Sequence, residues 1–109
     1  MAYNETLANR IDEIVKGKKN FVRKEMFGGI GYLYNGNMCV GVHKDELIVR
    51  FDPKTTDALM KEKGVKPFDI TGRPMKGWIL VNSDGIKGND LNKWFDISFS
   101  FVKKLPSKK

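Results

Sequence analysis

Residues 23–51 read RKEMFGGIGYLYNGNMCVGVHKDELIVRF, and this stretch decides the fold of the chain. Its apolar side chains alternate with small or polar ones, a spacing typical of strands that bury one face. Asn35-Gly36 and Lys44-Asp45 interrupt the alternation with residues that favour tight turns. The stretch therefore predicts a meander of antiparallel strands, to which the rest of the chain adds helices.

The two turns also predict the register of the meander. If φ is positive at both Asn35 and Gly36, a two-residue turn places Tyr34 opposite Asn37 and Leu33 opposite Met38. The pairs expected around the second turn are Val42 with Leu47, Val40 with Val49 and Cys39 with Arg50.

Regular alternation then divides the meander into two faces. The inner face, expected beneath the helices, consists of Leu33, Met38, Val40, Val42, Leu47, Val49 and Phe51. The opposite face consists of Ile30, Tyr32, Tyr34, Cys39, Ile48 and Arg50. Aromatic and arginine side chains are enriched in binding hot spots, so the second face is a predicted protein-binding surface, with a homodimer as its simplest form. Alternatively, an aromatic helix at the end of the chain crosses over and covers it.

Three helices are expected around the meander. The first spans 4–16 and ends before Gly17; the second spans 53–63, between an Asp52 cap and Gly64; the third spans 90–105, with Asn89 as its cap. Strands are expected at 21–27 and 77–81, and residues 65–76, with two prolines and a glycine, are expected to form an ordered loop. The order α-β(4)-α-β-α predicts an α+β fold, a two-layer α/β sandwich with a mostly antiparallel sheet.

Length and composition predict a single domain over residues 1–109, with a helix end and a frayed basic tail at 103–109. No window approaches the roughly 20 apolar residues of a membrane span, and the N-terminus lacks the apolar core of a signal peptide. We therefore expect a cytoplasmic protein with no membrane partner. The net charge of +7 invites a nucleic-acid interpretation. However, scattered lysines are more often a solvated surface, and four of them, Lys103, Lys104, Lys108 and Lys109, lie at the end of the chain.

The sequence offers little catalytic chemistry. His43 is the only histidine and Cys39 the only cysteine, so paired histidine chemistry and an internal disulfide are excluded. The glycines of MFGGIGYLYNGN lie between expected strands, where no helix N-terminus follows to hold a phosphate. We therefore predict no enzymatic activity, no catalytic residues, no metal site and no cofactor.

Three phrases of the chain, MFGGIGYLYNGNMCVGV, LIVRF and DITGRPMKGWILV, closely resemble the N-terminal domain of the TfoX/Sxy family, the bacterial regulators of natural competence. The resemblance implies a two-layer fold of α-β(4)-α-β-α type. Family members known as competence regulators carry a second, helical domain and are thought to assist the cyclic-AMP receptor protein, whereas this chain resembles a stand-alone N-terminal domain. The residues that match the family pattern and are not evidently core are Arg50, Gly72, Arg73, Pro74, Lys76 and Gly77.

These observations together predict a non-enzymatic protein-interaction domain, an auxiliary regulator of transcription. Its partner would be a transcription factor or a second copy of the chain. The candidate partner-binding residues are Tyr32, Tyr34, Ile48, Arg50, Arg73 and Lys76. Two alternatives stay open: direct nucleic-acid binding through lysines and the exposed tyrosines, and a small anionic-ligand site if Arg50, Arg73 and Lys76 converge.

Overall fold

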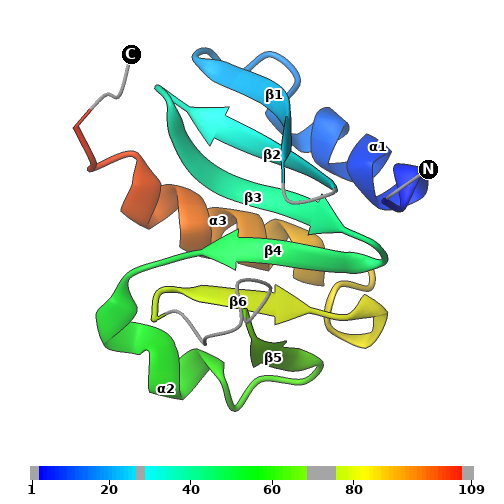
Figure 1. Ribbon diagram of the computed structural model, residues 1–109, viewed down its shortest axis with the longest axis vertical. Coiled ribbons are helices and arrows are strands. Elements are labelled where there is room, and N and C mark those ends of the chain that lie inside the picture. The colour runs from blue at the N-terminus through cyan, green and yellow to red at the C-terminus, as the bar shows by residue number, and fades with distance from the viewer. Residues whose placement is uncertain (1–2, 27–28, 69–75, 107–109) are drawn as a thin grey trace.

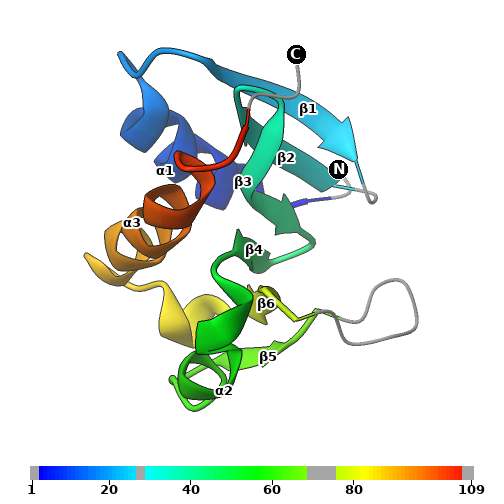
Figure 2. The ribbon, with the colours of Figure 1, turned by 90° about the vertical axis from the view of Figure 1, so that its left-hand side faces the viewer.

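The structure is a computed structural model that describes residues 3–26, 29–68 and 76–106. It contains a six-stranded sheet in the order β1-β2-β3-β4-β6-β5, in which each neighbouring pair is antiparallel. Helices α1 and α3 lie against one face of this sheet (Figures 1 and 2). The predicted α+β class is confirmed. The strands are β1 (Phe21–Met26), β2 (Gly29–Tyr34), β3 (Asn37–His43), β4 (Glu46–Arg50), β5 (Val65–Pro67) and β6 (Trp78–Val81).

The two long helices form where the sequence predicts them. Helix α1 (Glu5–Val15) begins at Asn4, whose side chain accepts a hydrogen bond from the Leu7 backbone N–H, and it buries Leu7, Ala8 and Ile11. Helix α3 (Asp90–Val102) ends earlier than expected, and the Asn89 side chain does not cap it by a hydrogen bond. The chain beyond α3 is held at Pro106, whose carbonyl accepts a hydrogen bond of 2.8 Å from the Asn37 side chain.

The second predicted helix is much shorter than expected. A 3-10 turn (Pro53–Thr55) leads into α2 (Thr56–Leu59), in which Ala58 is exposed. Asp52 caps this segment as predicted, by accepting from the Lys54 N–H. The hydroxyls of Thr55 and Thr56 donate to the carbonyls of Asp52 and Pro53, and such local bonds compete with a regular helix.

The stretch expected to be a loop after α2 contains a further strand, β5, at one edge of the sheet. An edge position tolerates Pro67, because the missing N–H would otherwise face solvent. Next to it, Lys66 forms an ion pair of 2.8 Å with Glu46. The opposite edge is β1, whose Arg23, Lys24 and Glu25 are exposed. Charged side chains of this kind discourage further strand pairing.

Both predicted turns are confirmed. Asn35 and Gly36 have φ of 50° and 84°, and Tyr34 and Leu33 pair with Asn37 and Met38 as expected. In the second hairpin, Val42 pairs with Leu47 and Val40 with Val49, also as predicted.

The predicted division into two faces is wrong on β2 and on part of β3, because β3 contains a bulge. The register shifts between Tyr32, which pairs with Val40, and Leu33, which pairs with Met38, so Cys39 is an extra residue. A bulge inserts one residue and interrupts the alternation of the strand. Leu33 and Met38, expected on the inner face, therefore lie on the outer face. Ile30, Tyr32, Tyr34 and Cys39, expected on the outer face, lie on the inner one.

The inner face forms the main core with α1 and α3. The closing helix does not cross over to the other face; its Leu91, Trp94, Phe95 and Val102 are buried in the same cluster as Val40, Val42 and Val49. The hydroxyl of Ser98 in α3 donates a hydrogen bond of 2.7 Å to the Cys39 carbonyl, in the bulge. The bulge is thus fixed directly to the helix that covers it.

The outer face carries a second, smaller core. Phe68, just after β5, is 1% exposed and packs with Met38, Ile48 and Leu80, while Leu33 and Trp78 lie partly buried beside them. Ile48, expected to be open to a partner, is fully covered. Within residues 3–26, 29–68 and 76–106, every helix is too short or too polar to cross a lipid bilayer.

We predict that the chain unfolds in one cooperative step, because α1 and α3 cover the same sheet and share its core. Calorimetric and van't Hoff enthalpies should agree, and circular dichroism and tryptophan fluorescence should give one midpoint. Two separated transitions would show that residues 1–109 contain more than one unit of folding.

Candidate protein-binding site

Of the six candidate partner-binding residues, Tyr32 is buried and serves to hold the fold together. Its side chain is 1% exposed. The hydroxyl donates toward the Ala8 carbonyl and toward Oδ1 of Asp12, at 3.0 and 2.7 Å, and so joins β2 to α1. Burial, with the hydrogen bond to Asp12, raises the pKa of Tyr32 above its usual value. Tyr32 therefore offers no surface to a partner.

Tyr34 is also partly buried, in a cluster of aromatic rings at the edge of the core. Its ring centroid lies 5.2 Å from that of Phe21 and 5.1 Å from that of Phe99. Lys76 is exposed. Gly72, Arg73 and Pro74 lie outside the described residues, so the convergence of Arg50, Arg73 and Lys76 on an anion stays a prediction.

Arg50 differs from the other candidates because its charged side chain is half-buried beside aromatic rings. It ends β4 opposite Trp78, the first residue of β6, and its side chain is half-buried. The guanidinium carbon lies 5.3 Å from the centroid of the Trp78 ring and 5.8 Å from that of Phe101 in α3. Two aromatic rings therefore hold this cation at the end of the sheet where β4 stops and the last part of α3 approaches (Figure 1).

The charge of Arg50 has no counter-charge or hydrogen-bond acceptor in the described part of the chain. Arg23 bonds to Asp12 and Tyr3, and Arg10 bonds to the carbonyls of Ile86 and Gly88, whereas the described neighbours of the Arg50 charge are two rings and the Cys39 thiol. Burial accordingly lowers the pKa of Arg50 from its usual value, because the charged form loses hydration. A guanidinium that is partly desolvated without an anion is poised to accept one from outside.

A groove adjoins this cation. Phe101, which flanks Arg50, also lines a cavity of about 330 Å³ between α3 and the turn before α2. The other lining residues are Asp52, Thr55, Ile97, Ser100, Lys104 and Leu105. The side that faces the viewer in Figure 2 carries both the end of α3 and α2. We call Arg50, Trp78, Phe101 and this groove the Arg50 site.

The sequence alone does not identify Trp78 and Phe101 as neighbours of Arg50, although both lie in stretches with recognisable patterns. The sequence does not indicate that β6 pairs with β4, and without that pairing Trp78 cannot be placed opposite Arg50. Phe101 belongs to the apolar stripe of α3, so the sequence indicates only that its ring packs in the core.

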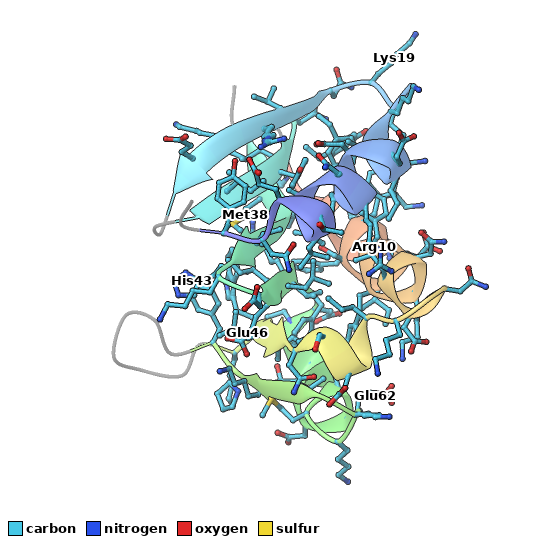
Figure 3. All side chains as sticks on the ribbon, turned by 90° about the vertical axis from the view of Figure 1, so that its right-hand side faces the viewer. Arg10, Lys19, Met38, His43, Glu46 and Glu62 are labelled. Carbon is cyan, nitrogen blue, oxygen red and sulfur yellow. The ribbon has the colours of Figure 1, made fainter. Side chains whose placement is uncertain are left out.

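A larger cavity, of about 670 Å³, lies between α1 and α3, and its lining includes Arg10, Glu13, Leu91, Phe95 and Asp96. Arg10 projects from α1 toward the start of α3 (Figure 3), where its guanidinium donates to the Ile86 and Gly88 carbonyls at 2.8 and 3.1 Å. Its hydrogen bonds are thus made within the protein, and charges of both signs surround the cavity. Arg10 fastens α1 to the entry of α3.

Cys39 is fully buried, and Ser98 lies against it, with Oγ 3.2 Å from Sγ. Burial raises the pKa of the Cys39 thiol to about 12. Near neutral pH the thiol is therefore protonated, which is the unreactive form. The thiol fills space beneath α3.

We predict that the buried thiol of Cys39 makes the stability of the fold depend on pH. The unfolded thiol loses its proton near pH 8.5, so above that pH the unfolded state binds fewer protons and the folded state loses stability. The wild type should lose about 1–2 kcal/mol more than Cys39→Ala between pH 7 and 10. Urea titrations of both proteins at the two pH values check this. An equal loss in both would contradict the buried, neutral thiol.

Comparison with models of protein families matches residues 13–102 to the model described as the TfoX N-terminal domain. The match covers most of the 109 residues and both halves of the sheet. Neither a search of curated proteins nor a search of solved structures finds a match.

Proposed function

Because the chain belongs to the TfoX N-terminal domain family, we propose that it is a non-enzymatic protein-interaction domain of a transcriptional regulator of the competence type, and that it contacts its partner through the Arg50 site. The observation that carries this proposal is the half-buried guanidinium of Arg50, held between two rings with no anion in the described structure. Arginine and tryptophan side chains in such settings are the residue types most enriched in binding hot spots.

A different protein suits this site better than a second copy of the chain. A two-fold interface centred on Arg50 would bring that cation toward its own counterpart, and like charges in a partly desolvated contact are unfavourable. The face earlier predicted to mediate a homodimer is also covered, because Tyr32 and Ile48 are buried. We therefore propose a heterologous partner, with a transcription factor as the leading class.

Direct nucleic-acid binding receives less support. Stacking on bases requires exposed rings, whereas Tyr32 is buried and Tyr34 packs between Phe21 and Phe99. The net charge of +7 alone would favour non-specific attraction to phosphates and faster encounter with any acidic partner.

Site-specific photo-crosslinking tests the proposal. A photoreactive amino acid replaces Lys76, which is exposed and two residues before Trp78, and a control protein carries it at Lys87, exposed next to the start of α3. In cells that encode the chain, the Lys76 position should give a discrete adduct that the Lys87 position does not give. Adding Arg50→Ala should reduce that adduct about tenfold, whereas Arg50→Lys, which keeps the charge but loses the planar fork, should reduce it less.

The matched control for Arg50→Ala is Lys103→Ala, because Lys103 is also a cation over a ring, 5.8 Å from the centroid of Phe99, but it lies outside the Arg50 site. It should leave the adduct unchanged. An adduct that persists in Arg50→Ala, with folding verified by circular dichroism, would place the partner elsewhere and reject the Arg50 site.

A further inference from the structure

Resting on the proposed function, we infer that the Arg50 site binds a short acidic segment of the partner protein, with a carboxylate on the Arg50 guanidinium and a neighbouring apolar side chain in the groove beside Phe101.

The Arg50 guanidinium can accept a carboxylate at its edge. Rings that lie against the face of a guanidinium leave its N–H groups, which lie in the plane, available at the edge. The guanidinium carbon of Arg50 lies over the rings of Trp78 and Phe101, and no described residue accepts a hydrogen bond from it. The fork of a guanidinium matches the two oxygens of a carboxylate, and this bidentate pair is among the stronger polar contacts in proteins.

The groove beside Phe101 can hold an apolar side chain. Ile97, Phe101 and Leu105 recur at intervals of four along α3 and its end, and all three are only partly buried. They give the groove an apolar wall, while Ser100 and Lys104 are exposed beside it. With a volume of about 330 Å³, the groove lies at the small end of the range for ligand pockets. That volume suits a single apolar side chain together with its backbone.

The Arg50 cation and the groove are adjacent. Phe101 both flanks the Arg50 guanidinium and lines the groove, so a ligand at one would lie next to the other. A segment with an acidic residue beside an aliphatic or aromatic one can therefore fill both at once. Such a segment also complements a chain with a net charge of +7.

The surroundings favour a carboxylate in a peptide over the phosphates of a nucleic acid. A nucleic-acid backbone is held by rows of lysine and arginine that neutralise successive phosphates. Around Arg50 the described neighbours are rings and the Cys39 thiol, and the groove contains the acidic Asp52 as well as Lys104. The site thus offers one strong cation next to apolar surface.

Titration of the isotope-labelled full chain with synthetic peptides, followed by NMR, tests the inference. The probe is a capped peptide with the core Glu-Leu-Asp-Leu-Phe-Glu, and the matched probe has Gln-Leu-Asn-Leu-Phe-Gln. The acidic peptide should shift the side-chain Nε–H signal of Arg50 and the indole signal of Trp78, and it should bind about tenfold more tightly than the neutral one. The indole signal of the buried Trp94 should stay in place.

Three variants separate the parts of the site. Arg50→Ala should abolish the difference between the two peptides, and Lys103→Ala should keep it. Ser100→Tyr adds a large side chain at the exposed rim of the groove, so it should weaken both peptides while the preference for the acidic one remains.

Equal binding of the two peptides, or an acidic peptide that shifts neither signal, would overturn the inference. So would a stronger response to inorganic phosphate or to a single-stranded oligonucleotide, with an affinity that falls steeply between 50 and 200 mM salt as phosphate contacts require. If an Arg50-dependent crosslink forms in cells while the peptides fail, the proposed function stands and the acidic-segment inference falls. If the peptides bind through Arg50 but no crosslink forms, the site chemistry stands and the proposed cellular role falls.

Discussion

Replacing Trp94 with alanine should lower the free energy of unfolding by about 3–5 kcal/mol, the range for removing a large side chain from a packed core. Trp94 is 0% exposed at the centre of the cluster that joins α3 to the sheet. Its indole N–H also donates a hydrogen bond of 2.9 Å to the Gly85 carbonyl, in the turn that precedes α3. The variant therefore loses buried apolar contact and leaves a buried carbonyl without its donor.

Urea denaturation followed by circular dichroism measures this loss. The control is Asn92→Ala, on an exposed position of the same helix, which should change the free energy of unfolding by less than about 0.5 kcal/mol. Similar stabilities of the Trp94 and Asn92 variants would reject the placement of Trp94 in the core.

Replacing Phe68 with alanine should also cost about 3–5 kcal/mol, although Phe68 lies on the other side of the sheet. Its ring packs on Met38, Ile48 and Leu80, and its centroid lies 5.5 Å from that of Trp78. Removal of the ring uncovers an apolar surface that the folded protein otherwise closes. The variant should therefore also bind a hydrophobic dye that the wild type does not bind.

Lys66→Ala is the matched control for Phe68, because Lys66 lies two residues earlier, on β5, and its exposed ion pair with Glu46 is worth at most about 1 kcal/mol. Thermal or urea denaturation compares the two variants. A Phe68 variant as stable as the Lys66 variant, with no added dye binding, would show that the outer face is open in the native protein.

The sequence was informative at the first hairpin and at the ends of α1, where local chemistry decides the structure. Asn35-Gly36 favours positive φ at both positions, and this fixes the first hairpin; Asn4 and Gly17 mark the two ends of α1. In contrast, alternation continues through residues 37–42 with no sign of the bulge at Cys39. The bulge depends on contacts distant in sequence, among them the hydrogen bond from Ser98 to the Cys39 carbonyl, 59 positions away.

The candidate site shows the same limit. Arg50 was identified from the sequence as a candidate contact, and it is the one candidate among the described residues with a free charge beside aromatic surface. Its neighbours Trp78 and Phe101 were not identified, because their positions follow from the pairing of β6 with β4 and from the path of α3. Tyr32 and Ile48 were both assigned to an open face. The bulge instead places Tyr32 on the inner face, and Phe68 packs on Ile48.

The two edges of the sheet bear on how the protein behaves when it is crowded. At one edge β5 has three residues and ends in Pro67, and at the other β1 presents Arg23, Lys24 and Glu25. Neither is a long, flat, apolar template, the kind of edge on which strands of neighbouring molecules add and fibrils grow. The native fold can therefore leave the aromatic and apolar surface of the Arg50 site partly exposed without offering neighbouring molecules an edge strand on which to add.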